Sequence, residues 1–222
     1  MKTPQPDEGR VLLINKPYEW TSFDAVNKLR YKLKMKKIGH AGTLDPLATG
    51  LLIICTGKMT KRIEEFMGLE KEYTGTFVLG ASTPSHDLET EVDAQHDISG
   101  LTEEAIRTAT QPFTGKISQL PPMHSAIRVG GKRAYEFARK GQEVELKPRE
   151  VEVSVFEITS IELPNVDFRI VCSKGTYIRS IARDFGKALG VGAYLSALCR
   201  TRIGSFSLAN AQQLDDIPES TR

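Results

Sequence analysis

Apolar and polar residues follow two periods along this chain of 222 residues. Residues 72–79 alternate between the two classes and are rich in Tyr, Thr, Phe and Val, which predicts a β-strand. The β-rich runs 150–163 and 166–173, joined by Pro164-Asn165, predict an antiparallel pair. Short apolar or β-rich runs predict further strands at 11–14, 51–55 and about 202–208.

Other segments repeat their apolar residues every three or four positions, as a helix with one buried face does. One is residues 23–33, with Phe23 and Leu33 at the ends of the predicted buried face, and residues 21–24 before it resemble a capping box. Another is residues 178–189, which Gly190 would end. Because helices and strands follow one another in mixed order, the sequence predicts an α+β fold with a mixed, largely antiparallel central sheet flanked by helices.

The composition is that of an ordinary globular protein, with 40% hydrophobic and 26% charged residues. A chain of this length can form one compact core, so we expect residues 1–222 to be a single domain. No apolar run reaches the roughly 18 residues that cross a membrane, and the first eight residues lack a signal-peptide core. The expected location is therefore cytoplasmic, without membrane attachment. Three cysteines with no Cys-x-x-Cys spacing argue against a disulfide framework and a zinc site.

The net charge is only +2, but the charges are unevenly distributed. Residues 28–37 contain six bases and no acid, whereas residues 82–100 are turn-rich and acidic, which predicts an exposed excursion. A basic run can be the solvated face of a helix or a contact with phosphate. Here it directly precedes a glycine-rich segment, and this position favours phosphate contact.

That glycine-rich segment, residues 39–50, contains Asp45 as its only acid. Its glycines permit tight backbone turns and the close approach of a ligand, while Pro46 favours an extended conformation at Asp45. Asp45 would thus lie on a stiff turn with its carboxylate available to a substrate. An Asp-Pro pair among glycines can also be a plain surface turn.

Residues 39–50 closely resemble the catalytic loop of the TruB family of tRNA pseudouridine synthases, in which the aspartate is essential. Five further blocks resemble the family's motifs in the family's order: 15–22, 71–75, 119–126 with 130–135, 173–180, and 194–204. The chain departs from the family's usual Gly, Tyr and Lys at Glu19, His124 and Arg128. The resemblance implies the pseudouridine-synthase catalytic fold and an isomerase.

The resemblance also implies residue roles, with Asp45 as the catalytic aspartate and Arg179 as its bidentate partner. A buried carboxylate tends to keep its proton unless a cation pairs with it, which explains the need for an arginine. Tyr73 would stack on the flipped uracil and place a hydroxyl near C5, where a proton must leave. The implied substrate-binding residues are His40, Tyr177, Leu198, Lys16 and Asp87.

Two of these residues have alternative roles. His40 would fill the space that the extruded base leaves, or would bond the glycine-rich loop. Lys16 would contact phosphate, or would buttress the loop.

The implied reaction converts the T-loop uridine of tRNA, position 55, to pseudouridine after base flipping. The C1′–N1 bond breaks and C1′ joins C5, so nothing is oxidised, and we expect no cofactor and no metal. The expected partner is the T-arm of tRNA, with no obligate protein partner. Most bacterial members continue into a C-terminal RNA-binding module, which we do not expect here because the chain ends soon after residues 214–218. An RNA chaperone and the catalytic subunit of a guide-RNA particle are the rival interpretations.

Overall fold

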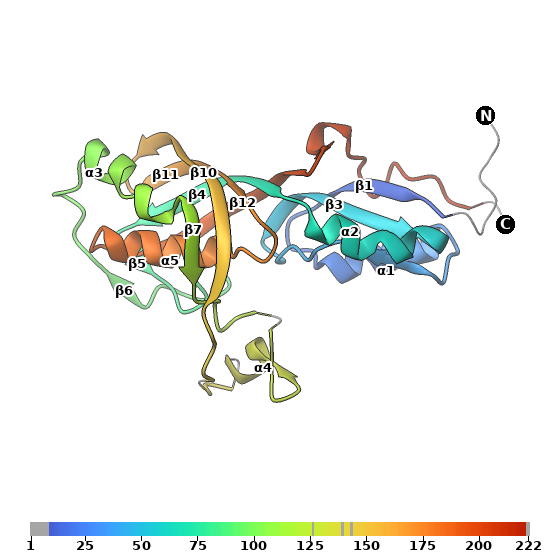
Figure 1. The fold of residues 1–222 in the computed structure, drawn as a ribbon, viewed down its shortest axis with the longest axis horizontal. Helices are drawn as coiled ribbons and strands as arrows, with labels where there is room; N and C mark the ends of the chain where they lie inside the picture. Colours follow the sequence, from blue (N-terminus) through green and yellow to red (C-terminus); the bar gives the residue numbers. More distant parts are fainter. Residues whose placement is uncertain (1–8, 126, 139, 143, 221–222) are drawn as a thin grey trace. The chain divides into compact units, whose positions relative to one another are not determined.

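The computed structural model describes residues 9–125, 127–138, 140–142 and 144–220 (Figure 1). The N-terminal residues examined for a signal peptide, and position 126 of the 119–126 motif, lie outside the described residues. The chain forms two compact units. The first combines the residues up to Thr74 with those from Leu198 onward, and the second runs from Gly75 to Ala197. The single domain expected from chain length stays a prediction.

The first unit is built around the long strand β3 (Ala48–Thr56). Strands β1 (Val11–Lys16) and β2 (Ile38–His40) pair with β3 in antiparallel orientation. Strand β12 (Ala193–Ile203) lies parallel to β3, with Leu198 opposite Ala48, so the sheet is mixed as predicted. The remaining elements here are α1 (Ser22–Lys32), a 3-10 helix (Gly57–Arg62), α2 (Ile63–Gly68), the start of β4 (Lys71–Leu79), β13 (Phe206–Ser207) and a second 3-10 helix (Leu208–Asn210).

Both faces of β3 are buried, which explains why its sequence is a continuous apolar run rather than an alternating one. Its residues 52 and 54 belong to a core cluster with the apolar face of α1 and with Leu214 and Ile217. Its residues 51, 53 and 55 belong to a second cluster with Phe66 of α2 and Ile203 of β12. The two helices are thereby held on opposite faces of the strand that follows the Asp45 loop.

Helix α1 begins with the predicted capping box. The Thr21 hydroxyl accepts a hydrogen bond from the Asp24 amide, and the Asp24 carboxylate accepts one from the Thr21 amide. The buried face differs from the prediction at one end, because Phe23 is 59% exposed. The side chains that face the core are Ser22, Ala25, Val26 and Leu29, and at 100° per residue Phe23 lies on the other side of the helix.

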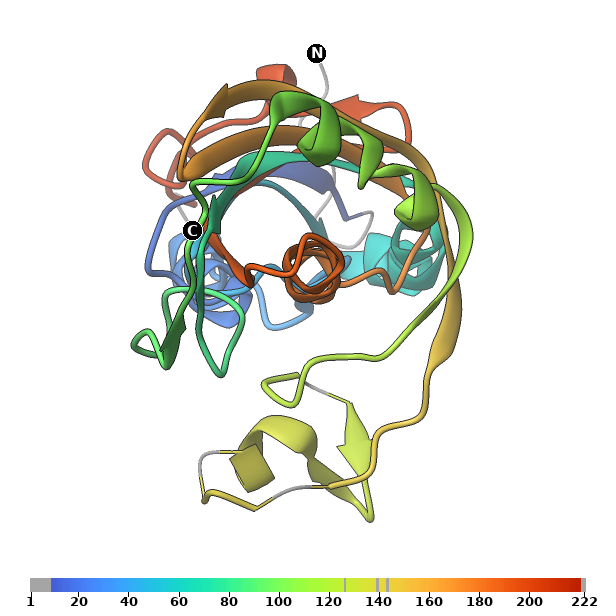
Figure 2. The same cartoon turned by 90° about the vertical axis from the view of Figure 1, so that its left-hand side faces the viewer.

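The second unit contains the other half of the sheet, in the order β12-β4-β11-β10-β7. Strands β10 (Arg149–Glu162) and β11 (Asn165–Cys172) form the predicted antiparallel pair, and β7 (Gly115–Gln119) pairs with the outer edge of β10. Helix α5 (Ile178–Ala188) lies against one face of these curved strands (Figure 2). Its Phe185 packs against Phe77 of β4 and Phe156 of β10.

The small elements of the second unit lie in its connections. Between β4 and β7 these are the short pair β5 (Ala81–Ser82) and β6 (Ala94–Gln95), α3 (Glu103–Thr108) and a 3-10 helix (Gln111–Phe113). Between β7 and β10 they are the hairpin of β8 (Arg128–Val129) and β9 (Lys132–Arg133), and α4 (Ala134–Ala138). The hairpin and α4 form a small group of their own away from the sheet of this unit (Figure 2).

Two sequence predictions need correction. The single strand expected at about 202–208 is instead the end of β12, which runs from Ala193 to Ile203, a turn at residues 204–205, and the short β13 paired back onto β12. The first half of β12 was missed because its small and polar residues do not alternate clearly with apolar ones. The acidic excursion at 82–100 is only partly exposed, since Thr83, Ser85 and Asp87 are at most 6% exposed. Their hydroxyl and carboxylate oxygens form hydrogen bonds and an ion pair within the second unit. Within the described ranges, none of the helices has both the length and the apolar character needed to cross a membrane.

Candidate active site

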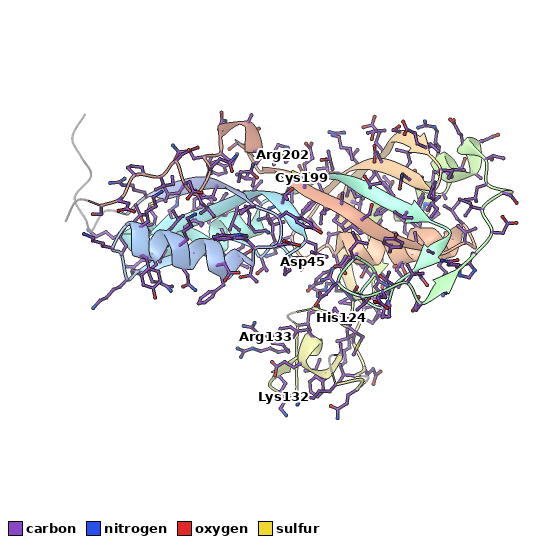
Figure 3. All side chains as sticks on the ribbon, turned by 180° about the vertical axis from the view of Figure 1, so that it is seen from behind. Asp45, His124, Lys132, Arg133, Cys199 and Arg202 are labelled. Atoms are coloured by element: carbon purple, nitrogen blue, oxygen red, sulfur yellow. The ribbon has the colours of Figure 1, made fainter. Side chains whose placement is uncertain are left out.

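Asp45 lies on a loop of the first unit between β2 and β3 (Figure 3). The Asp45 carbonyl accepts a hydrogen bond from the Ala48 amide at 3.1 Å, which closes a turn containing Pro46. Just before it, Leu44 is buried, and the Ser22 hydroxyl bonds both the amide and the carbonyl of Leu44, at 2.8 and 3.1 Å. The first turn of α1 therefore anchors the residue next to the aspartate.

Two buried cations hold the rest of this loop. The Arg200 guanidinium, on β12, donates to the carbonyls of Gly42, Thr43 and Leu51 at 3.1, 3.4 and 2.8 Å. The Lys16 ammonium, at the end of β1, donates to the carbonyls of Pro17, Trp20 and Pro46. Lys16 and Arg200 are the two largest fully buried side chains of the described residues. Buried charges persist only when well bonded, so these two act as fixed supports.

The close packing of β3 against β12 requires a glycine at position 50. A Cβ atom there would lie 2.4 Å from the Arg200 carbonyl, and Gly50 has a φ of +102°. The Thr49 hydroxyl also reaches the Leu198 carbonyl, at 3.4 Å. Gly50, the last residue of the 39–50 segment, thus allows β12 to approach β3 closely enough for Arg200 to reach the loop.

The Lys16 side chain is fully buried, and its hydrogen bonds support the loop. A contact of Lys16 with phosphate stays a prediction. Burial lowers the pKa of Lys16 to about 8, the negative charge of Asp45 acts in the opposite direction, and Arg200 adds to the lowering. Lys16 is therefore mainly an ammonium ion near neutral pH.

The other predicted residues of the first unit are His40, Tyr73 and Leu198, on strands β2, β4 and β12. His40 pairs with Ile54 at the end of β2, and burial together with the charge of Arg200 lowers its pKa, which favours the neutral imidazole. Its Nδ1 atom is buried and forms no hydrogen bond within the described part of the chain. Tyr73 on β4 is 9% exposed, and Leu198 on β12 is partly buried opposite Ala48. Their contacts with a base stay predictions.

Arg179 lies in the second unit, in the first turn of α5, and is only 4% exposed. Its Nε atom is 3.5 Å from a carboxylate oxygen of Asp87, which is itself 6% exposed. The remaining guanidinium nitrogens donate to the carbonyls of Ser85 and His124, at 3.2 and 2.8 Å. Arg179 and Asp87 thus form a buried ion pair, and the planar fork of arginine fits all three acceptors.

Hydroxyl groups hold the loop that carries Asp87. The Thr83 and Ser85 hydroxyls both donate to the Asp87 carbonyl, at 2.7 and 3.2 Å. The Thr90 hydroxyl oxygen lies 2.8 Å from that of Ser85 and accepts from the Ser85 amide. His86 adopts a left-handed conformation with a φ of +62°, which is uncommon for a residue with a side chain. This bonding explains why the start of the acidic excursion is buried.

Tyr177 is fixed by its main chain at the start of α5. The Gln119 side chain accepts from the Tyr177 amide at 2.8 Å and donates to the Tyr177 carbonyl at 3.1 Å. The Arg149 guanidinium lies 4.9 Å from the centre of the Tyr177 ring, a cation–π distance. Elsewhere in the second unit, Lys132 and Arg133 are exposed on the β8–β9 hairpin, which Figure 3 labels.

The predicted residues therefore divide between the units. Asp45, Lys16, His40, Tyr73 and Leu198 belong to the first, and Arg179, Asp87 and Tyr177 belong to the second. The pairing of Asp45 with Arg179 stays a prediction. Arg200, Ser22 and Gln119 were not predicted as site residues, although all three lie inside the motif blocks 194–204, 15–22 and 119–126.

Comparison with known proteins assigns this arrangement. The sequence matches the model of the TruB family pseudouridylate synthase N-terminal domain over residues 30–178, and that of the tRNA pseudouridylate synthase B C-terminal domain over residues 179–222. The fold and the Asp45 loop therefore define a pseudouridine synthase. The chain belongs to the TruB family.

Relatives of similar length support the assignment. The chain is 54% identical to tRNA pseudouridine synthase B of Flavobacterium johnsoniae over 220 residues, which is 96% of each chain. It is also 54% identical to tRNA pseudouridine synthase B of Phocaeicola vulgatus, covering 96% of this chain and 93% of that protein.

Solved structures show the same fold in longer chains. A crystal structure of a Cbf5-Nop10-Gar1 complex contains a chain that is 31% identical, with a TM-score of 0.73 over 95% of this chain. An H/ACA RNP bound to a substrate RNA containing 2′-deoxyuridine contains a similar chain, at 29% identity and a TM-score of 0.70. This chain spans about half the length of those two, 53% and 52%.

Proposed function

We propose that this chain isomerises the T-loop uridine of tRNA, position 55, to pseudouridine. The observation that carries the proposal is the construction of the Asp45 loop. Each carbonyl from Gly42 to Pro46 accepts a hydrogen bond, four of them from the buried side chains of Arg200, Ser22 and Lys16. So much bonding around one carboxylate is typical of a preorganised catalytic group.

Asp45 performs the chemistry at the sugar. Breaking the C1′–N1 bond and joining C1′ to C5 requires an ionised carboxylate beside C1′, whether it bonds to the sugar or removes a proton from it. The C5 proton then leaves and N1 takes up a proton, so the product is an isomer of the substrate. The reaction consumes no energy carrier and needs no cofactor.

Arg179 keeps the aspartate ionised and oriented. Asp87 and the carbonyls of Ser85 and His124 fix the guanidinium within the second unit. The planar fork would pair with the Asp45 carboxylate in the reacting complex. Asp87 acts through Arg179 in this proposal and is a positioning residue. Tyr73 stacks on the extruded uracil, Tyr177 and Leu198 line the base pocket, and His40 fills the gap in the RNA stack.

The substrate is tRNA, and the T-arm presents the target base. We propose that the chain works in the cytoplasm without an obligate protein partner or a membrane. The relatives of equal length, named as tRNA pseudouridine synthase B, support a stand-alone enzyme over the subunit of a guide-RNA particle. The retained Asp45 loop supports chemistry over a purely chaperoning role.

Incubation of the pure protein with an unmodified tRNA transcript, followed by position-resolved mapping, tests the proposal. We expect pseudouridine at position 55 with wild-type protein, and none with Asp45→Asn, which keeps the size of the side chain and removes its charge. Asp216→Asn alters an exposed carboxylate of the same unit and should leave activity unchanged. Turnover by a clean Asp45→Asn preparation would refute the catalytic assignment.

A further inference from the structure

Helix α1 exposes aromatic rings on a face that the fold does not use. Phe23 is 59% exposed and Tyr31 is 80% exposed. Together with Tyr18, they are the large aromatic side chains that are exposed in the described part of the chain, and all three fall within residues 18–31. Such clustering is informative, because single exposed apolar residues are common whereas grouped rings mark interaction sites.

The helix has three distinct sides. Ser22, Ala25, Val26 and Leu29 face the core. Lys28 and Lys32 face the C-terminal segment, where Lys28 pairs with Asp215 and Lys32 donates to the carbonyls of Leu214 and Asp215. The third side, which we call the outer face, carries Phe23, Asn27, Arg30 and Tyr31 at spacings of three and four residues.

The outer face carries one base, Arg30, and further bases follow the helix in sequence. The Arg30 guanidinium lies 5.9 Å from the centre of the Phe23 ring and donates to the Asn27 side chain, so the arginine and the ring lie together. Beyond the helix, Lys36 and Lys37 are exposed. Residues 25–44 contain no Asp or Glu, and Asp24 just before them is occupied by the capping box.

We propose that the outer face of α1 binds unpaired nucleotides of the RNA substrate. Its rings would stack on bases, and Arg30, Lys36 and Lys37 would contact the phosphates beside them. Exposed rings interleaved with cations are the arrangement that single-stranded RNA recognises, since every base has a π-face and every nucleotide a negative charge. The inference rests on the proposed function only in taking RNA as the ligand.

Binding of an unmodified tRNA transcript to the full chain, measured by fluorescence anisotropy over a range of salt concentrations, tests this surface. Tyr31→Ala and Phe23→Ala should each weaken binding by roughly 5- to 150-fold, the effect of losing one stacked base. The slope of log affinity against log salt should not change, because no charge is lost. Leu163→Ala, a change at an exposed apolar residue of the second unit, is the control and should bind like wild type.

Two conservative variants separate stacking from simple apolar contact. Tyr31→Phe keeps the ring and should bind like wild type, whereas Tyr31→Leu keeps apolar area without a π-face and should behave like Tyr31→Ala. Wild-type binding by Tyr31→Ala and Phe23→Ala, or by Tyr31→Leu, overturns the proposal. The two proposals fail independently: pseudouridine formation with no effect of Tyr31 removes only this surface, and a Tyr31 effect without pseudouridine formation removes only the enzymatic function.

Discussion

At the scale of single residues, the turn at Asp45 could be predicted from the sequence, whereas the side chains that support it could not. A lone acid between glycines and a proline indicates an available carboxylate from local sequence alone. Arg200 lies 155 residues further on and reaches the loop only because β12 runs parallel to β3. No local pattern distinguishes such a buried arginine from a surface one, so the sequence offered a motif but not the function of this residue within it.

Arg179→Ala should lose most activity, and Arg179→Lys should not restore it. A lysine cannot bond Asp87 and two carbonyls in one plane, and loss of one catalytic electrostatic contact typically costs on the order of 10² to 10³ in rate. Single-turnover kinetics would measure this. Arg183→Lys, on the same helix and paired with its neighbour Asp184, is the matched control and should stay near wild type. Equal turnover by Arg179→Lys and wild type would exclude a bidentate role.

His86 should make the protein less stable in acid. Burial, followed by the charges of Arg183 and Arg179, lowers its pKa to about 4, against the smaller opposing effects of the Thr83 backbone and Asp184. A histidine in the unfolded chain titrates near 6.5. Between these values the unfolded state binds more protons, so the free energy of unfolding falls as the pH falls.

The fall should amount to at most about 3 kcal/mol and should be smaller in His86→Gly, which also suits the positive φ at this position. Urea unfolding at pH 7 and pH 4.5 would measure it. His96→Gln, a change at an exposed histidine, should retain the wild-type dependence. If wild type and His86→Gly lose equal stability, His86 does not carry the effect.

At the scale of elements, local signals identified α1, α5 and the β10–β11 pair, because capping residues, glycine stops and turn residues act over a few positions. The same signals misplaced the start of β12 and gave no indication of β7 or the short β2. These strands depend on partners far away in sequence. The buried start of the 82–100 excursion was missed for a similar reason, since its polar residues are satisfied by α5 and by each other.

Ile217→Ala should destabilise the protein by about 2 to 5 kcal/mol, the usual effect of truncating a fully buried aliphatic side chain. Ile217 is 3% exposed and belongs to the core cluster that α1 and β3 share. Asp215→Ala, two residues away, removes only a largely exposed ion pair with Lys28 and should leave the free energy of unfolding nearly unchanged. Chemical denaturation of both variants checks this, and similar losses would mean that the segment is held by charge rather than by packing.

At the scale of the whole molecule, the net charge of +2 does not show that the basic residues fall into two groups, one bonded within the fold and one exposed to solvent. Part of the 28–37 run is used internally, since Lys28 and Lys32 bond the C-terminal segment. The sequence favoured phosphate contact for the run as a whole and could not separate these lysines from the exposed ones. That separation depends on where residues 214–220 pack.

Replacing both Lys36 and Lys37 by Gln should weaken tRNA binding. It should also reduce the slope of log affinity against log salt by up to about 1.4 to 1.8, because two phosphate contacts are lost. Lys28→Gln should leave the slope unchanged, because its charge is already paired with Asp215. Filter binding between low and moderate salt would measure both variants. An unchanged slope for the double variant would show that these lysines are merely solvated.

The discontinuity of the first unit has a consequence for biosynthesis. Asp45 emerges from the ribosome early, but the guanidinium that holds its loop belongs to residue 200, and the unit closes only when β12 reaches β3. Residues 75–197, by contrast, are contiguous and can acquire their fold during elongation. A nascent or prematurely terminated chain would therefore carry the aspartate without its supports. Competence for chemistry therefore requires synthesis of the chain beyond Arg200.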